Sequence, residues 1–145
     1  MPAMTRYNAI SEYLGDGTID LDNNTLRMTL HTSAFTVDVT QDTYAQLDAE
    51  LPTGNGYTSG GQNLTGVQWT RVDADTSLTS SPVQWTATGG DITAMYCVLS
   101  DATSGKLISY GPIKMSADAT PVPIDATATD GNTFTLSSSS WVDNG

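Results

Sequence analysis

The sequence predicts a mainly β protein: a single-domain antiparallel β-sandwich or jelly-roll-like barrel with one or two short helices near the N-terminal half. Short apolar runs recur with a period of two residues, and Gly-, Asn- and Asp-rich turns separate them at roughly 8–15 residues. The apolar content of 38% is low, and Thr, Ser and Gly fill the difference, which is typical of turn-rich β proteins. The length of 145 residues fits one domain, expected over residues 1–137 with a polar tail at 138–145.

Two short helices are expected near the N-terminus. The first spans residues 7–14 and ends before a Gly-Asp-Gly turn, because its apolar residues recur at helical spacing. The second spans residues 43–51, where Asp42 or Thr43 can cap the first amides and Pro52 stops the helix. The apolar stripes consist of Tyr7, Ile10, Tyr13 and Leu14 in the first helix and of Tyr44, Leu47 and Leu51 in the second.

The segment from Leu26 to His31 alternates strictly between apolar and polar residues. This pattern predicts a half-buried strand, with His31 on its polar side as an exposed or hydrogen-bonded structural residue. Phe35, Val37 and Val39 continue the alternation, as a strand or as an extended loop.

Strands are expected throughout the chain after Leu64. The run 92–100, ITAMYCVLS, is nearly all apolar and is predicted to be a central strand covered on both faces, or one that crosses the core. A hairpin turn follows at 101–105, and further strands are expected around Ile113 and Met115, Val122 and Ile124, and Phe134 and Leu136. Trp69 and Trp85 are expected in the core. The tail 138–145 is expected to be loose unless Trp141 docks.

The charge balance narrows the classes of partner. Five Lys and Arg stand against sixteen Asp and Glu, a formal net charge of -11. Binding to DNA or RNA needs many cations to neutralise phosphates, so nucleic acid is rejected as a partner, and so is an anionic membrane surface. The charge favours a basic protein surface instead. No apolar run is long enough for a membrane helix, and the N-terminus lacks a secretory signal pattern, so folding in a cytosol is expected.

Residues that could carry chemistry are few. His31 is the only histidine and Cys97 the only cysteine, which does not support a zinc or iron site or a nucleophile–base pair. Cys97 is expected to be a buried small apolar residue. The carboxylate-rich segment from Asp16 to Asn24 fails the EF-hand pattern, which leaves Asx turns or a calcium site of another kind. No cofactor or catalytic residue is assigned.

The passage from Leu47 to Trp69, LDAELPTGNGYTSGGQNLTGVQW, contains turns, aromatic residues and amides, but no nucleophile, base or metal cluster. Its glycines supply positions where φ can be positive. This composition favours a protein that assembles over one that reacts. Candidate interface residues are Asn55, Tyr57 and Gln62 in this passage and Trp141 near the C-terminus, because aromatic residues are enriched at contact sites.

Two stretches carry a resemblance to a known group. They are Glu50-Leu51 followed by GNGYTSGG at residues 54–61, and the stretch from Gly89 to Lys106. With the elements around them, from about Tyr7 to Ser137, they make the chain resemble small virion structural proteins of tailed bacteriophages.

The resemblance implies a non-enzymatic virion protein, assembled in the host bacterial cytoplasm. It would be a capsid decoration (cement) protein that binds the outer surface of the phage head. Its partner would be the major capsid protein or another virion protein, and it would form a homo-oligomer, a trimer or a dimer. A tail, neck or fibre component is the alternative, and a glycan-active or lysis enzyme using Asp73 is a remote one. Deleting Gly54–Gly61 is expected to abolish particle binding and to leave a folded β domain.

Overall fold

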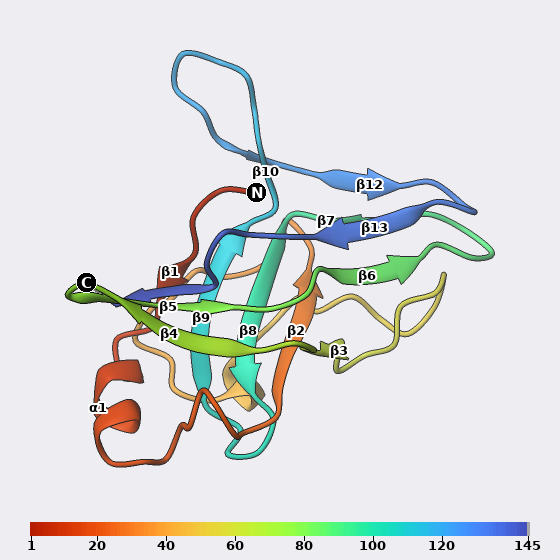
Figure 1. The fold of residues 1–145 in the computed structure, drawn as a ribbon. Helices are drawn as coiled ribbons and strands as arrows, with labels where there is room; N and C mark the ends of the chain where they lie inside the picture. Colours follow the sequence, from red (N-terminus) through yellow and green to blue (C-terminus); the bar gives the residue numbers. More distant parts are fainter. Residues whose placement is uncertain (145) are drawn as a thin grey trace.

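The computed structural model describes residues 1–144, which consist mainly of antiparallel strands (Figure 1). Strands make up 39% of the chain and helices 6%, which confirms the predicted mainly β class. The architecture is sandwich-like and not a closed barrel. The elements in chain order are β1 (Thr5–Arg6), α1 (Ile10–Gly15), β2 (Leu26–His31), the 3-10 turn η1 (Tyr44–Gln46), β3 (Gln62–Asn63), β4 (Gln68–Val72), β5 (Asp75–Thr79), β6 (Val83–Thr86), β7 (Ile92–Ala94), β8 (Tyr96–Asp101), β9 (Leu107–Pro112), β10 (Lys114–Met115), β11 (Pro123–Ile124), β12 (Ala126–Ala128), β13 (Thr133–Leu136) and β14 (Val142–Asn144).

The first layer is a five-stranded antiparallel sheet in the order β1-β9-β8-β2-β3. β8 lies at its centre, where Cys97 is opposite Leu30 on one side and Gly111 on the other. Cys97 and Leu99 belong to the main core, whereas Val98 belongs to a second apolar cluster. Because both faces are covered, the strand can be apolar at successive positions. The part of the run 92–100 that forms β8 is therefore a central strand covered on both faces, as expected.

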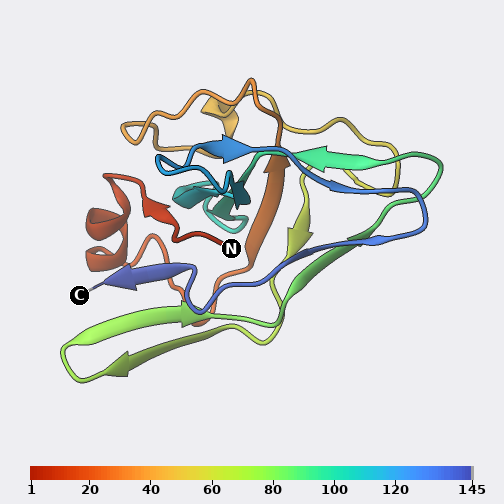
Figure 2. The ribbon, with the colours of Figure 1, turned by 90° about the horizontal axis from the view of Figure 1, so that it is seen from above.

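The second layer is a long two-stranded ribbon. Residues 76–94 run antiparallel to residues 126–144, with Leu78 opposite Val142, Trp85 opposite Phe134 and Ile92 opposite Ala128. Both strands turn at the same level, so the ribbon folds back on itself at one end (Figures 1 and 2). The β4–β5 hairpin extends the other end. The main core lies between this ribbon and the five-stranded sheet.

The apolar run 92–100 is two strands and not the single strand that the sequence predicted. β7 pairs with β12 in the ribbon, whereas β8 belongs to the sheet. Met95 lies at the break: its N–H donates to the carbonyl of His31 (2.9 Å), and its carbonyl accepts from the N–H of Ile113 (2.9 Å). The run crosses the core at this residue, which is the other arrangement that its composition allowed.

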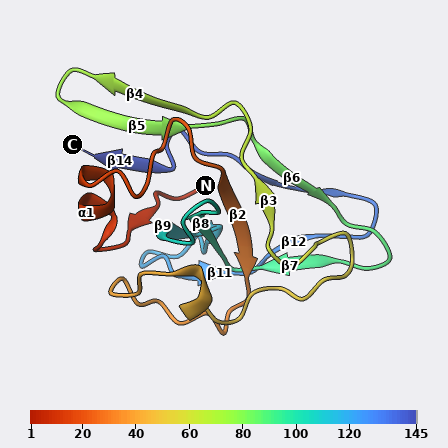
Figure 3. The ribbon, with the colours of Figure 1, turned by 90° about the horizontal axis from the view of Figure 1, so that it is seen from below.

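The segment 32–50 covers the outer face of the sheet, where Phe35 is buried beside Val98 (Figure 3). Thr29 and His31 lie under this cover and are fully buried. The expectation that the polar side of β2 faces solvent is therefore wrong, because a distant loop supplies the apolar and hydrogen-bonding surroundings. Residues 35–39 form this loop and no strand.

The expected helix 43–51 is only the short 3-10 turn η1. The Gln46 side chain folds back to accept hydrogen bonds from the N–H groups of Asp42 (2.7 Å) and Thr43 (2.9 Å), and the chain is extended at Leu47. The next residues then align with the end of β2, where the N–H of Leu51 donates to the carbonyl of Leu30 (3.0 Å). Pairing with β2 overrides the helical spacing of the apolar residues.

The first helix is also shorter than expected. α1 begins at Ile10, because Tyr7 prolongs the pairing of β1 and donates its N–H to the carbonyl of Ile108 (3.0 Å). At the other end of the chain Trp141 is 1% exposed, and its indole N–H donates to the Ser80 hydroxyl (2.7 Å). With Trp141 docked, β14 pairs with β5. The end of the chain is therefore part of the ribbon and not a loose tail.

Candidate interaction surfaces

The only histidine, His31, and the only cysteine, Cys97, are buried in the interior. The Nδ1 of His31 lies 2.8 Å from the carbonyl oxygen of Asp48, and its Nε2 lies 2.9 Å from the hydroxyl of Thr29. Burial lowers the pKa of the His31 ring, so the ring is neutral at pH 7. Burial also raises the pKa of the Cys97 thiol to about 12, which keeps it protonated and unreactive. Both residues therefore have structural roles.

Glu50 is a structural centre, a role that the sequence did not indicate. Its carboxylate accepts hydrogen bonds from the hydroxyls of Tyr44 (2.5 Å), Tyr57 (2.8 Å) and Ser59 (3.3 Å) and from the N–H of Gly60 (2.8 Å). Partial burial opposes ionisation, but these hydrogen bonds outweigh it and hold the pKa of the carboxyl below its ordinary value. The carboxylate thus joins residues 57–60 to η1. Two tyrosines and a glycine-rich loop close to a lone Glu are the only sequence signal for this cluster.

Tyr57 is a core residue and not the surface contact that the sequence predicted. It is 1% exposed, and its ring lies 5.8 Å from that of Trp85. Its hydroxyl accepts a hydrogen bond from the N–H of Leu30 (3.1 Å). β3 pairs with β2 only at Arg27 and Met28, so Tyr57 takes the place of a strand partner at Leu30. Trp141 is likewise buried and unavailable to a partner. The correction has a common cause, because both rings fill the space between the two layers.

Three loops meet where the ribbon folds back, on the right of Figure 1, and we name them together the tip. They are residues 53–56, 87–91 and 129–132. The carbonyl of Asn55 accepts from the N–H of Thr88 (3.1 Å), and the Asn55 side chain donates to the carbonyl of Asp91 (3.1 Å). The carboxylate of Asp130 accepts from the N–H of Gly89 (3.0 Å). Segments far apart in sequence are therefore held in one fixed arrangement.

The loops of the tip approach each other closely at two glycines. Gly56 has a φ of +91°, and a Cβ there would lie 3.1 Å from the carbonyl carbon of Thr86 and closer still to its oxygen. A Cβ on Gly90 would meet the side chain of Asn55 at 2.7–2.9 Å. Asn55 itself has a φ of 55°, a conformation that asparagine tolerates better than most residues. Glycine is thus needed at Gly56, where the backbone of Thr86 lies close, whereas a side chain at Gly90 would displace only the end of the Asn55 side chain.

The tip presents an exposed polar surface with a hollow beside it. Asn55, Thr88 and Asp130 are exposed, and so is the candidate residue Gln62 on β3. The hollow has a volume of about 430 Å³ between the chain around Pro52 and β7. Its lining consists of Thr32, Leu51, Pro52, Thr53, Gly54, Asn55, Asp91, Ile92 and Thr93. Of the four candidate interface residues, the structure thus leaves Asn55 and Gln62 at the surface, and only Asn55 at the tip.

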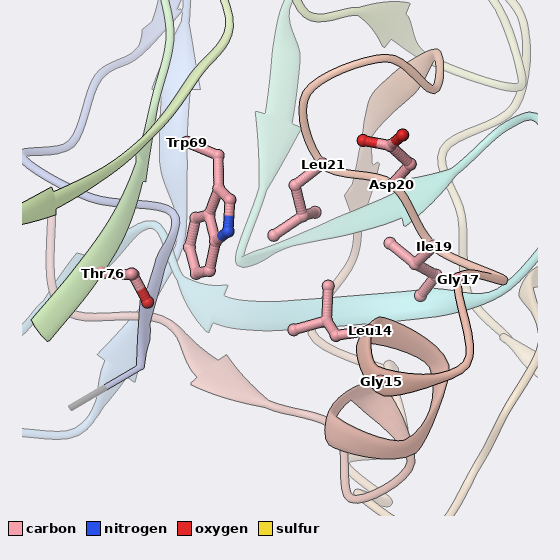
Figure 4. A pocket seen from close by; sticks show the side chains of 8 residues that line it. All are labelled: Leu14, Gly15, Gly17, Ile19, Asp20, Leu21, Trp69 and Thr76. Carbon is pink, nitrogen blue, oxygen red and sulfur yellow. The ribbon is translucent and has the colours of Figure 1, made fainter.

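A second hollow of about 530 Å³ lies between α1 with the loop that follows it and the β4–β5 hairpin (Figure 4), and we name it the Trp69 groove. Its lining consists of Leu14, Gly15, Gly17, Ile19, Asp20, Leu21, Trp69 and Thr76. Figure 4 shows Leu14 and Leu21 facing the indole of Trp69 across the hollow. Trp69 was expected in the core with Trp85, but only Trp85 is buried there, and Trp69 is a half-buried wall.

The carboxylate-rich segment before β2 forms turns. The Asp16 carboxylate accepts from the N–H of Thr18 (2.8 Å), and that of Asp20 accepts from the N–H of Asp22 (3.0 Å) and from the side chain of Asn23 (2.8 Å). These are Asx turns, one of the two arrangements left open by the sequence. Within residues 1–144 no three Asp, Glu, His or Cys side chains are grouped so that they could hold a metal ion.

The chain matches no protein-family model, and searches of the curated proteins and of the solved structures find no similar protein. None of the helices among residues 1–144 has the length and the apolar content that crossing a membrane requires.

Proposed function

We propose that the chain is a non-enzymatic virion structural protein that decorates the outside of a tailed-phage head and stabilises it by protein–protein contacts made through the tip. The tip is the observation that carries the proposal. Its three loops are exposed, yet hydrogen bonds hold them in place before any partner binds. A preorganised surface loses little conformational freedom on binding, which favours the formation of a stable contact.

The charge supports a protein partner for this surface. With a formal net charge of -11, the chain is attracted to a surface rich in Lys and Arg, so the proposed contact on the major capsid protein is a basic region. The shell of a head is symmetric, so a trimer or a dimer of the chain would match its local axes. The resemblance to small phage virion proteins suggests that this contact is made on the phage particle.

The test uses particles that lack the chain, obtained from phage in which its gene is deleted. Purified protein is added, and the bound fraction is measured by sedimentation. Thr88→Arg places a bulky cation on the exposed tip and should weaken binding at least about tenfold. Thr70→Arg makes the same change on exposed β4, at the other end of the ribbon, and should bind like the unaltered chain.

The outcomes separate the proposal from its alternatives. If the unaltered chain does not sediment with the particles, the decoration role is wrong. If Thr88→Arg binds as well as Thr70→Arg, the tip is not the contact. Copy number distinguishes the location, because on the order of hundreds of copies per particle indicate the shell and about 3–12 indicate the tail or neck.

Deleting Gly54–Gly61 is not a clean version of this test. The deletion removes Tyr57 together with its hydrogen bonds to Leu30 and Glu50, so we expect the sheet and not only the tip to be disturbed. Point variants at exposed tip positions leave the core intact.

A further inference from the structure

We propose that the Trp69 groove is a second docking site, which receives an extended segment of a partner protein that carries an apolar side chain followed by Lys or Arg. The groove lies beside α1 and the β4–β5 hairpin, at the opposite end of the ribbon from the tip (Figure 1). It is therefore independent of the contact proposed for the tip.

The shape and lining of the groove suit an inserted apolar side chain. Ile19 and Leu21 are almost fully buried and form its floor, while Leu14 and Trp69 are half-buried and form opposite walls. The volume of about 530 Å³ lies within the range of established binding pockets. An aliphatic side chain that enters beside the indole would complete the burial of both walls.

Carboxylates outnumber cations in the segments around the groove, and Asp20 belongs to its lining. The stretch 7–26 contains four carboxylates, and the cations that contact α1 are Arg6, which donates to the Ser11 hydroxyl (2.6 Å), and Lys106, which lies over the Tyr13 ring. These carboxylates belong to Glu12, Asp16, Asp20 and Asp22. Hydrogen bonds, chiefly from the Asn23 side chain, hold the pKa of Asp20 below its usual value, so this charge is present at neutral pH. The hairpin on the other side adds Asp73 and Asp75 and one cation, Arg71.

The charge selects the occupant. A cation placed next to the inserted apolar side chain would meet a net negative rim, and an arginine could also stack on the Trp69 indole. A second copy of the chain would bring few cations to this groove, because it has five Lys and Arg against sixteen Asp and Glu. The occupant is therefore a basic segment of a different protein.

The experiment follows the three indole N–H signals of the 15N-labelled full-length chain by NMR. The probe is the peptide N-acetyl-Leu-Lys-Arg-amide, with N-acetyl-Leu-Glu-Glu-amide as its charge-reversed control. We expect the basic peptide to shift the Trp69 signal with a Kd on the order of 1 mM, to leave Trp85 and Trp141 in place, and to weaken as salt rises. The acidic peptide should bind at least about tenfold more weakly.

Two matched variants test the contribution of charge. Asp20→Asn and Asp118→Asn remove the same charge, but Asp118 is exposed in the loop between β10 and β11. Only Asp20→Asn should raise the Kd of the basic peptide, by about two- to fivefold. If both variants change the Kd equally, the rim of the groove does not select the cation.

Other outcomes overturn the proposal directly, and they use the unaltered chain. These are no shift of Trp69 at about 10 mM basic peptide, equal shifts by both peptides, a shift of Trp69 that follows protein dilution without peptide, or a shift produced only by the neutral sugar tri-N-acetylchitotriose. The last two would assign the groove to a second copy of the chain or to a glycan.

Discussion

Two neighbouring glycines allow a controlled test of how β3 joins the sheet. Gly60 and Gly61 both have positive φ, +98° and +70°. A Cβ on Gly61 would lie 2.8 Å from the carbonyl carbon of Met28, closer still to its oxygen, and 3.1 Å from the Cα of Thr29. A Cβ on Gly60 would meet nothing within 4 Å. Alanine at either position therefore strains the backbone, but only Gly61→Ala adds a clash with β2.

The magnitudes follow from these two terms. A left-handed backbone costs alanine about 1–2 kcal/mol, so Gly60→Ala should lower the free energy of unfolding by about that amount. Gly61→Ala should lose a further 1–3 kcal/mol, roughly the cost of overpacking, because β3 must move away from Met28. The entropy that alanine removes from the unfolded chain is the same in both variants and cancels in the comparison.

Urea denaturation measures the difference. With a slope of about 2 kcal/mol per molar urea, the midpoint of Gly61→Ala should lie roughly 0.5–1.5 M below that of Gly60→Ala. If the two midpoints agree within about 0.2 M, the close approach of Gly61 to β2 does not constrain the fold, and the reasoning is refuted.

Three further predictions concern the buried polar groups. Glu50→Gln should lower the free energy of unfolding by about 1–3 kcal/mol at pH 7, since the carboxylate accepts four hydrogen bonds. The pKa of Glu50 in the folded protein is below its ordinary value of 4.5, so the carboxylate stabilises the fold above pH 4.5, and this stabilisation is lost as the pH falls through the folded pKa. The urea midpoints of the unaltered chain and of Glu50→Gln should therefore converge at low pH. NMR titration of His31 should give a pKa below 6.5, and stability should decline as the pH falls below that value, because burial disfavours the charged ring; a pKa of 6.5 or above would contradict the burial. Cys97 should react with a thiol reagent in urea but not in the folded protein, and rapid reaction without urea would show that its site opens.

Local patterns in the sequence were sufficient for the fold class and for most turns. The alternation in β2 and the turns between β6 and β7, β8 and β9, and β12 and β13 are properties of adjacent residues. The glycines at 54, 56, 60 and 61 were expected to allow positive φ, and all four adopt it. Such features depend on backbone sterics, which a few neighbouring residues set.

The errors share a different origin. The 43–51 segment has helical spacing, but its last residues pair with β2, which lies earlier in the chain. The polar positions of β2 have the spacing of an exposed face, but the loop 32–50 covers them, and His31 is the hydrogen-bonded structural residue that its position also allowed. In both cases a long-range contact decided the result, and period and propensity carry no information about which distant segment will cover a face.

The proposed functional surfaces also combine features set by composition with features set by the tertiary structure. The sequence by itself determined the acidic charge and the glycine- and asparagine-rich character of the 54–61 passage, because these are properties of composition. Only the tertiary structure decided that Tyr57 and Trp141 are core residues and that Trp69 forms the wall of a groove. It also decided that Asn55 bonds the 87–91 turn, which in turn bonds Asp130. These arrangements depend on how the ribbon folds back over the sheet and buries apolar surface from both layers, which is a global property of the chain.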